Sequence, residues 1–540
     1  MTLSRTTRWL LSLASGFLLA IAFPNYNWAI LAWLAVAILI IAIDGASPPQ
    51  AAFCGWLHGI VFYPVALPWI YVVLRQYGNL DAFTAAGVLA LISAAGGVFS
   101  GVFAVGVVFF ERRRKGWGLL AAPFLWVVLE WARTHLPNIG FPWNLAGYAA
   151  AENIALMQLA KWTGIYGLSF LIVAFNALLA RAILRGNGWT GRPWGAVVVS
   201  AIVIVGIAWT GPRFIPAVPA DHIAHLVQTD FPQSESYPAN WMIVHSPELN
   251  QLAAISINAA RRGEQKAESL NADGQFPAGL PASVHLSGPV VDGPVIWPEV
   301  PAPFSLQDPR FAARARDIAR ESGEDLLVGA VEWRPARRGY DAFNSAVLFD
   351  PGGQRIFTYD KIHLVPYGEF VPWRNLVPFA GRLTADLADF TSGGSRSTGS
   401  FPGGQFGVFI CYESIFPAEV RQFVKNGAQL LVNVSNDGWF GRSAAPAQHL
   451  LMARVRAVEN RRWILRATNN GFTVSVDPYG RIAASLPTDV RGELDAPYAF
   501  RSERTPYTRW GDWIVWMCAA MLVFLVTASL MSPAGRKRRS

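Results

Sequence analysis

The sequence predicts a two-part protein, in which a layered α/β domain is inserted between the seventh and eighth helices of a membrane α-helical bundle. Two observations carry this prediction. Apolar stretches long enough to cross a bilayer occupy residues 1–211 and return at 511–531, whereas residues 212–510 are polar and alternate between strand-like and helix-like patterns. A chain of 540 residues is also too long for one core, since single cores stop growing near roughly 250 to 300 residues.

The composition is typical of a membrane protein. Charged residues make up only 15%, and 22 Trp and 33 Phe form a heavy aromatic load. The net charge is +9, but the basic clusters at 112–115 and 536–539 flank apolar runs, so they indicate cytoplasmic loops and no nucleic-acid partner is expected. Of the three cysteines, only Cys411 lies in the polar part, and a disulfide framework is therefore not expected.

The apolar stretches are long enough to span a bilayer as helices, because a span needs about 20 apolar residues. They lie at 8–24, 27–43, 52–74, 83–110, 117–133, 163–184, 193–210 and 511–531. Residues 20–22, Ala-Ile-Ala, also resemble the cleavage site of a secretory signal, but a second apolar stretch follows at once and favours a retained span. The predicted parts are therefore 1–211 with seven spans, 212–510, and 511–540 with the eighth span.

The charges of the short loops predict the orientation. Basic residues precede the first span, follow the fourth and follow the sixth, and all of these positions fall on one side: Arg5, Arg8, residues 112–115, Arg181, Arg185 and Arg192. Since cytoplasmic loops carry an excess of Lys and Arg, the N-terminus is expected inside and residues 212–510 outside. The cluster at 536–539 then returns to the inside, as an even number of spans requires.

The polar part shows an α/β rhythm. Short apolar runs predict buried strands at 223–227, 326–331, 346–349, 406–410 and 430–434, and helical spacing occurs at 308–322 and 446–462. Residues 262–290 are rich in Gly, Ala, Pro and Ser, and we expect a mobile loop there.

Three segments of the polar part place a reactive side chain after an apolar run. They end or centre on Glu299, Lys361 and Cys411, and Glu369 follows the second. Strand ends are where α/β folds gather such groups. A cysteine is a strong nucleophile only as a thiolate, and its ordinary pKa of about 8.5 leaves little thiolate at neutral pH. A carboxylate that removes the proton and a cation that stabilises the negative charge would supply what the thiol needs.

These segments resemble the nitrilase superfamily, in which a Glu, a Lys and a Cys act in this chain order on an αββα sandwich. The resemblance implies Glu299 as general base, Lys361 as oxyanion stabiliser and Cys411 as nucleophile. Glu369 matches the second glutamate that helps to position this set. The neighbours of the nucleophile, Tyr412 and Glu413, are expected to shape the site, although both residue types also occur as packing residues.

Together with the apolar stretches, the match narrows to the apolipoprotein N-acyltransferases. The motifs that carry this resemblance are residues 361–372, 411–414, 435–441 and 448–449, with Gly-Phe-Pro-Trp-Asn at 140–144 between two spans. The family implies an acyl chain taken from a membrane phospholipid, held as a thioester on Cys411, and passed to the α-amine of a diacylated apolipoprotein. It also implies the bacterial inner membrane, with residues 212–510 in the periplasm.

Several further residues are candidates for substrate contacts. The family resemblance matches Trp241 to a substrate-facing tryptophan. The other candidates are Asn436, Trp439 and Phe440, and the two aromatics are expected either to contact acyl chains or to pack in a core. No metal and no cofactor are expected, because a thiol, a carboxylate and an ammonium group suffice for thioester chemistry. His363 and His449 invite a Cys-His or metal-dependent hydrolase interpretation, but the sequence has no HExxH or paired-ligand spacing.

Two alternative functions stay open on the sequence. The first is a membrane-tethered amidase or nitrilase that uses the same Cys411. The second is a transporter whose exported domain only binds a ligand; its spans should carry buried ionisable residues, for which Glu130 is the clearest candidate.

Overall fold

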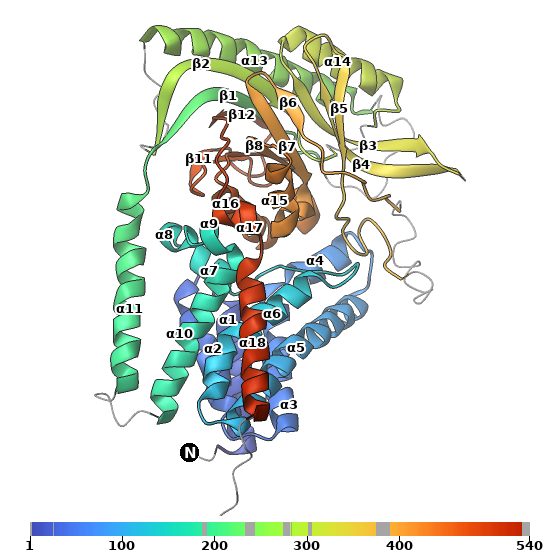
Figure 1. Ribbon diagram of the computed structural model, residues 1–540. Coiled ribbons are helices and arrows are strands. Elements are labelled where there is room, and N and C mark those ends of the chain that lie inside the picture. The colour runs from blue at the N-terminus through green and yellow to red at the C-terminus, as the bar shows by residue number, and fades with distance from the viewer. Residues whose placement is uncertain are drawn as a thin grey trace, which may run out of the picture. The chain divides into compact units, whose positions relative to one another are not determined.

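The computed structural model describes residues 3–24, 26–185, 192–232, 244–273, 281, 283–300, 305–337, 339–373 and 389–531. The chain forms two compact units. The helical unit comprises Met1–Tyr71, Asp81–Pro212 and Trp510–Ser540, and the α/β unit comprises Val72–Leu80 and Arg213–Arg509. Figure 1 shows the helices of the first unit and the layered strands of the second.

The helical unit has a helix at every predicted span. The long helices are α1 (Arg5–Ala20), α2 (Ala32–Ile43), α3 (Pro48–Ala66), α5 (Ala82–Arg113), α6 (Trp117–Thr134), α10 (Ile165–Arg185), α11 (Arg192–Thr210) and α18 (Trp513–Met531), and α7 (Gly147–Ala151), α8 (Ile154–Met157) and α9 (Ala160–Thr163) are short. The short helix α4 (Trp69–Gln76) begins in this unit and continues into the α/β unit from Val72. Among the described residues, α5, α10, α11 and α18 are long and apolar enough to cross a membrane, and α3 with α4, bent by 58°, makes a fifth candidate. Of the eight predicted spans, four or five thus meet the length and apolarity of a membrane span; α1 has only 16 residues, and α6 carries Glu130 and Arg133.

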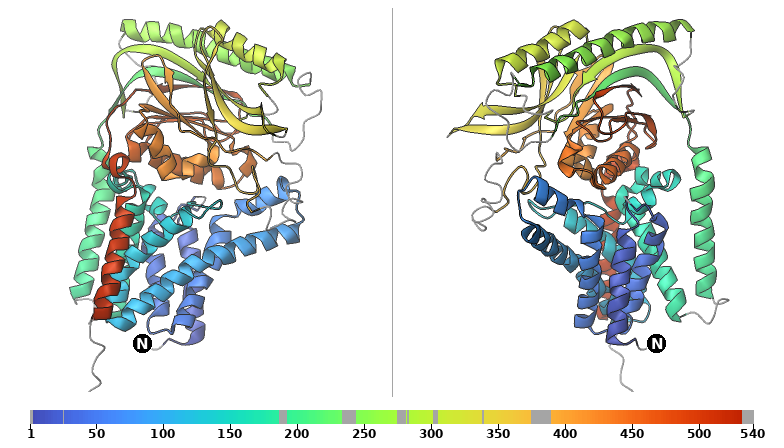
Figure 2. Two further views of the ribbon diagram at one scale, coloured as in Figure 1. Left: turned by 45° about the vertical axis from the view of Figure 1, so that its right-hand side comes forward. Right: turned by 180° about the vertical axis from the view of Figure 1, so that it is seen from behind.

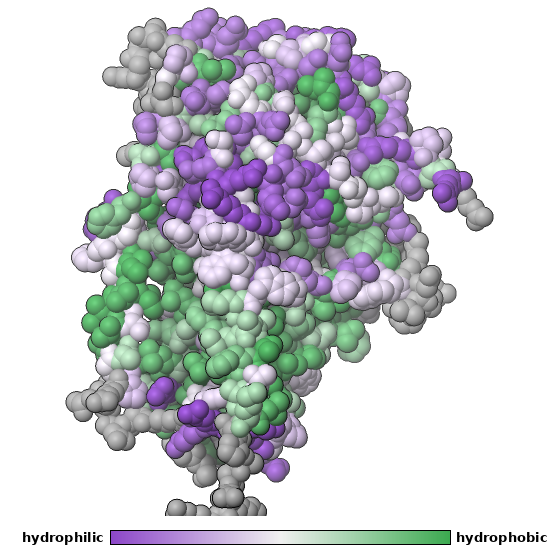
Figure 3. Space-filling model, in the orientation of Figure 1, coloured by the Kyte–Doolittle hydropathy of each residue, from purple (hydrophilic) through white to green (hydrophobic). Residues whose placement is uncertain are grey.

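Glycines allow α3 and α5 to pack closely. A Cβ on Gly59 would lie 2.3 Å from Cα of Gly97, and a Cβ on Gly55 would lie 2.2 Å from the carbonyl oxygen of Ser100. The Gly97-x-x-x-Gly101 spacing therefore serves helix contacts within this unit. The outward face is apolar, and Figure 3 shows hydrophobic residues covering the helices. On α11, the side chains of Ile202 and Val205 are 65% and 60% exposed, which suits a surface covered by lipid.

The α/β unit contains two six-stranded sheets. The first has the order β12 (Gly492–Tyr498), β1 (Val218–Gln228), β2 (Val284–Ile296), β3 (Leu326–Pro335), β4 (Tyr340–Phe349) and β5 (Arg355–Asp360). The second has the order β11 (Ile482–Ser485), β10 (Val474–Val476), β9 (Ile464–Thr468), β8 (Leu430–Ser435), β7 (Gly404–Ile410) and β6 (Gly399–Phe401). Strands β1, β2 and β3 run parallel, as do β7, β8 and β9, and the remaining neighbours are antiparallel.

The two sheets share one core and are covered by helices on their outer faces. Successive side chains of β3 point to opposite faces of the sheet. Leu327 packs between the sheets with Val408 and Val432, whereas Leu326 packs with α13 (Ser246–Asp273) and α14 (Pro309–Ser322). Helices α15 (Pro417–Lys425) and α16 (Ala445–Asn460) lie against the second sheet. Figure 2 shows the resulting order of helix, sheet, sheet and helix, and the predicted strands and helices are confirmed.

The loop predicted at 262–290 is wrong for most of its length. Helix α13 continues to Asp273, and β2 begins at Val284. The helix persists because Ala253, Ala260 and Ala267, spaced by seven residues, are buried. The residues that suggested a loop concentrate between these two elements, where 274–280 and 282 lie outside the described residues.

Candidate active site

The site is built where strands end. Glu299 follows β2, Lys361 follows β5, and Cys411 follows β7 as the first residue of a 3-10 turn, η4 (Cys411–Ile415). Hydrogen bonds join the first two side chains directly, and electrostatic interactions connect both to the Cys411 thiol. Three segments that the sequence singled out separately are thus brought to one place.

Two carboxylates share one lysine at this place. The Lys361 Nζ donates to Glu299 Oε1 at 3.1 Å and to Glu369 Oε1 at 2.9 Å. The other carboxylate oxygens accept main-chain N–H groups, from Asn436 to Glu299 at 2.9 Å and from Val365 to Glu369 at 2.8 Å. The carboxylates are therefore oriented by donors on both sides.

Asn344, on β4, bridges the same two carboxylates. Its Nδ2 donates to Glu299 Oε1 at 2.8 Å and to Glu369 Oε1 at 2.9 Å. The main-chain carbonyl oxygen of Asn344 accepts the main-chain N–H of Lys361 at 2.8 Å. This residue was not predicted from the sequence. The available signal is weak: a polar residue in the buried part of a strand needs hydrogen-bond partners, but the pattern does not say which ones.

The charge of Lys361 is fixed by its neighbours. Burial lowers the pKa of Lys361, but Glu299 and Glu369 outweigh burial and hold this pKa well above its ordinary value. The side chain is 1% exposed, so the ammonium charge is shielded from water. An ammonium group in such a setting can stabilise an oxyanion strongly, since screening by solvent is weak.

The Cys411 thiol is buried and remains protonated at rest. Burial and the charge of Glu299 raise the pKa of Cys411 well above its ordinary value, and the opposite effect of Lys361 is smaller. The backbone of Cys411 has φ of +47°, in the left-handed region that residues with a side chain rarely adopt. A protonated thiol needs a base before it can attack, and the adjacent carboxylate has the required chemistry.

Glu413 ties the cysteine turn to the lysine loop. Its Oε1 accepts the Tyr359 hydroxyl at 2.7 Å and the N–H groups of Ile362 and His363 at 2.7 and 3.1 Å, while its Oε2 accepts the N–H of Ile410 at 2.7 Å. Burial raises the pKa of Glu413 to about 7, against the lowering effect of these donors. The residue therefore holds together the two segments that carry Cys411 and Lys361.

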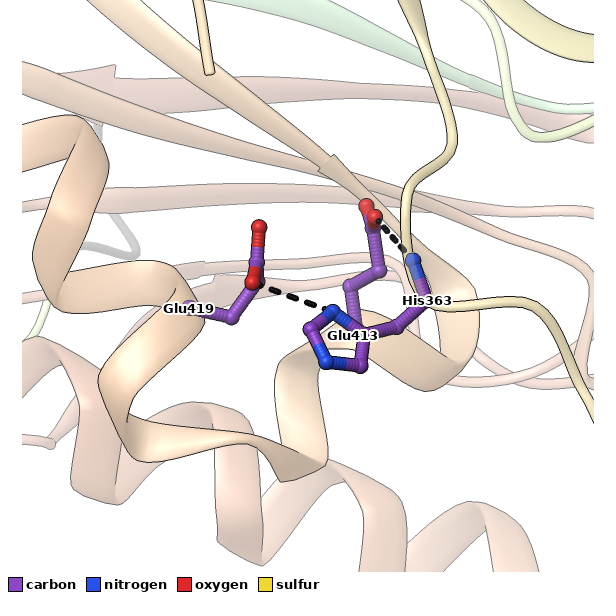
Figure 4. Close-up of side chains that lie close together, drawn as sticks. All are labelled: His363, Glu413 and Glu419. Atoms are coloured by element: carbon purple, nitrogen blue, oxygen red, sulfur yellow. Dashed lines mark hydrogen bonds and ion pairs between the residues drawn. The ribbon is translucent and has the colours of Figure 1, made fainter. Parts of the chain in front are cut away.

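Figure 4 shows His363, Glu413 and Glu419 close together, as a metal site would require. Their donor atoms are already engaged by protein groups. Glu419 Oε2 lies 3.0 Å from Nδ1 of His363, and the Arg396 guanidinium donates to both Glu419 oxygens at 2.6 and 2.8 Å. With Glu413 accepting four donors as well, the chemistry of this donor set suits internal ion pairs better than a divalent cation.

Comparison with known proteins identifies the family. Residues 15–178 match the family described as Apolipoprotein N-acyltransferase N-terminal domain, and residues 295–497 match Carbon-nitrogen hydrolase. The apolipoprotein N-acyltransferase of Geobacter metallireducens is 34% identical over 520 residues, which cover 95% of this chain and 93% of that protein. The chain belongs to the apolipoprotein N-acyltransferase family. The enzymes of that name from Methylococcus capsulatus and Rhodopseudomonas palustris are 34% and 32% identical, and each comparison covers at least 95% of this chain and 94% of the relative.

Membership in the apolipoprotein N-acyltransferase family confirms the predicted N-acyltransferase with a domain of the nitrilase superfamily. It also agrees with a multi-pass membrane protein, as the apolar helices indicate. The assignment favours acyl transfer over the transporter interpretation. Consistently, the Glu130 carboxylate accepts the Trp126 indole N–H at 2.8 Å and the Ala146 N–H at 2.7 Å, so it holds a loop against α6.

The other predicted residues of this acyltransferase have different positions. Tyr412 is buried against Phe416, with ring centroids 5.2 Å apart, and burial raises the pKa of Tyr412. Asn436 meets the general-base candidate through its main-chain N–H. Trp439 and Phe440 lie half-buried in the turn η5 (Asp437–Phe440), and Trp241 lies outside the described residues.

Proposed function

We propose that this chain transfers an acyl chain from a membrane phospholipid to the N-terminal α-amine of an S-diacylglyceryl-cysteine apolipoprotein, through a thioester on Cys411. The observation that carries the proposal is the buried constellation in which Lys361 bridges Glu299 and Glu369 beside a protonated thiol. Such a site supplies a nucleophile, a base and a fixed positive charge without any further group.

In the first half-reaction, Glu299 takes the thiol proton of Cys411 as the sulfur attacks the carbonyl carbon of a phospholipid ester. The negative charge that develops on the carbonyl oxygen is stabilised by the Lys361 ammonium group. When the ester C–O bond breaks, Glu299 returns its proton to the departing alkoxide. A lysophospholipid leaves, and the acyl chain stays on sulfur.

In the second half-reaction the acyl chain passes from Cys411 to the amine. The α-amine of the apolipoprotein attacks the thioester carbon, and Glu299 accepts the proton that the amine loses. As the C–S bond breaks, the proton returns to Cys411, and an amide is formed. Lys361 stabilises the second oxyanion as it did the first.

The membrane part suits this pair of lipid substrates. We propose that residues 1–211 supply seven spans and residues 511–540 an eighth, and that residues 212–510 face the periplasm of a bacterial inner membrane. Lifting an acyl chain into water costs about 0.8 kcal/mol per CH₂ group, so a site that receives lipids laterally avoids this cost. The loop charges support the same orientation.

The test is to trap the thioester. Purified protein incubated with phospholipid and no acceptor should gain one fatty-acyl mass on the peptide that contains Cys411 and release lysophospholipid. Hydroxylamine should remove the acyl group, and Cys411→Ala should show no acylation. Adding a diacylglyceryl-cysteine peptide should then move the chain to the peptide's α-amine, as mass spectrometry would detect.

A hydrolase would behave differently in the same experiment. It would release free fatty acid into water without the acceptor peptide, or would turn over small amides with no lipid donor. Either result, or an acyl group on a residue other than Cys411, contradicts the proposal.

A further inference from the structure

The nucleophile adopts a backbone conformation that its surroundings must hold. Cys411 has φ of +47° at the junction of β7 and η4. A left-handed conformation at a residue with a side chain is strained and persists only where contacts enforce it. The Cys411 main chain is therefore a place to look for a side chain that enforces it.

His449, on α16, makes such a contact. Its side chain is fully buried, and its Nε2 lies 3.0 Å from the carbonyl oxygen of Cys411. A carbonyl oxygen only accepts hydrogen bonds, so Nε2 carries the proton and donates it. The imidazole thus faces the main chain of the nucleophile.

A buried ionic network holds the other edge of this imidazole. The His449 Nδ1 lies 3.0 Å from Asp437 Oδ1 and 3.1 Å from Nη2 of Arg466. The same Arg466 nitrogen donates to Asp437 Oδ2 at 2.7 Å, and the Ser435 hydroxyl donates to Asp437 Oδ1 at 2.9 Å. The network joins β8, η5, α16 and β9, and its side chains are inaccessible to water.

The protonation states suit a fixed hydrogen bond rather than proton transfer. Burial raises the pKa of Asp437, but Arg466 and His449 outweigh burial and hold this pKa well below its ordinary value. Burial, together with the charge of Arg466, lowers the pKa of His449, so the imidazole is neutral near neutral pH. The proton on Nε2 remains available to the Cys411 carbonyl.

We infer that His449, backed by Asp437 and Arg466, is a positioning residue for the acyl transfer proposed above. The peptide unit that joins Cys411 to Tyr412 is planar and rigid, so holding its carbonyl oxygen also sets the direction of the Tyr412 N–H on the opposite edge. It sets the Cα–Cβ bond of Cys411 as well, and hence the path of the sulfur. His449 therefore aims the nucleophile, while Glu299 moves the proton.

Two substitutions of similar size separate this role from general support of the fold. In His449→Gln the longer side chain can place an amide N–H near the former Nε2 and reach the Cys411 carbonyl. In His449→Asn the amide lies near the former Nδ1, where it can meet Arg466 and Asp437 but not Cys411. Each variant can keep the contacts of one ring nitrogen and loses those of the other.

The measurement is single-turnover thioester formation on full-length protein in detergent, over a range of phospholipid concentrations. We expect His449→Asn to lower the maximal acylation rate at least about tenfold, with little change in the half-saturating concentration, because one buried hydrogen bond to the nucleophile is lost. His449→Gln should restore most of that loss. Melting temperatures are measured alongside, and Leu451→Ala, buried on the same helix, serves as the control for destabilised α16.

The outcomes distinguish this inference from the function on which it rests. If unmodified protein forms no thioester on Cys411, the proposed function fails. If unmodified protein forms the thioester but the Gln and Asn variants lose rate equally, or if Leu451→Ala loses as much rate per folded molecule, the positioning role of His449 is wrong.

Discussion

The Glu299 carboxylate accepts three hydrogen bonds from the protein, from Asn344, Lys361 and the Asn436 main chain. A carboxylate offers about four acceptor positions, so one position is left for the thiol proton. The donors fix the carboxylate in place, and this arrangement suits a base that must accept a proton and pass it on in each half-reaction.

Replacing this carboxylate with an amide tests the role of the base. Glu299→Gln keeps the size of the side chain but cannot accept the proton of Cys411, so single-turnover acylation should slow by at least ~10²-fold. Phospholipid binding should persist. Glu369→Gln is the matched control, because it also removes one carboxylate from Lys361 but leaves the base. Near-normal acylation by Glu299→Gln, or equal losses in both variants, would show that Glu299 is not the base.

At the scale of residues, the sequence predicts those reactive side chains that lie in a contiguous motif. Glu299, Lys361 and Cys411 each follow an apolar run, and the structure brings them together. Asn344 was missed, because its role depends on the register of β4 beside β3 and β5. No local pattern encodes which carboxylates a buried amide will meet.

At the scale of elements, a buried histidine joins three strands of the first sheet. The His225 imidazole, on β1, lies 2.9 Å from Asp292 on β2 and 3.1 Å from Asp495 on β12. Burial lowers the pKa of His225, but the two carboxylates outweigh burial and raise it to about 9. Lys266 of α13 also meets Asp495, at 2.7 Å.

This histidine predicts a loss of stability at alkaline pH. Its folded pKa of about 9 exceeds the unfolded value of 6.5, so its contribution is complete below 6.5 and is lost as the pH rises through 9. Burial and Asp292 raise the pKa of Glu324 to about 8, which acts in the same direction. The difference in melting temperature between unmodified protein and His225→Gln should therefore shrink from pH 6.5 to pH 9.5.

Thermal unfolding in detergent, followed by tryptophan fluorescence at several pH values, measures this difference. Lys266→Gln removes another partner of Asp495 and serves as the control. The difference in melting temperature between unmodified protein and Lys266→Gln should not shrink in the same way as the pH rises. A gap between unmodified protein and His225→Gln that stays constant with pH would show that the imidazole carries no extra charge in the folded state.

Helices and strands were predictable where one pattern of apolar residues dominates the segment. The apolar runs of β3, β7 and β8 and the helical spacing of α14 and α16 were confirmed within a few residues. Helix α13 was not predicted, and its second half was assigned to a loop, because polar residues and Gly263 conceal an alanine stripe that packs on the sheet. Tertiary packing, and not local propensity, decides where that helix ends.

At the scale of the whole molecule, the two kinds of surface were predictable from composition, whereas the number of spans stays a prediction. Hydropathy predicts eight spans, and the described helices contain four or five that meet the length and polarity a span requires. The difference comes from polar residues such as Glu130 and Arg133, which α6 accommodates through contacts with its own unit.

The orientation follows from the loop charges and can be measured directly. Lys115 and Ser502 are exposed, so Lys115→Cys and Ser502→Cys provide reporters on either side of the predicted membrane. In a background without Cys54, Cys411 and Cys518, an impermeant thiol reagent added to intact cells should label only the second reporter. Labelling of both in broken cells is the control. Equal labelling in intact cells would reverse or remove the orientation.

One short segment of the α/β unit is synthesised long before the residue that it contacts. Residues 72–80 belong to the α/β unit, where the Tyr77 hydroxyl donates to the Gly438 carbonyl oxygen at 2.9 Å, a contact that spans 361 positions of sequence. A ribosome that adds roughly 5 to 20 residues per second makes Tyr77 about 20 to 70 seconds before Gly438. The first part of the α/β unit to be synthesised is therefore complete well before the turn that it contacts. A gene fragment that starts at residue 213 would encode a unit that lacks this piece.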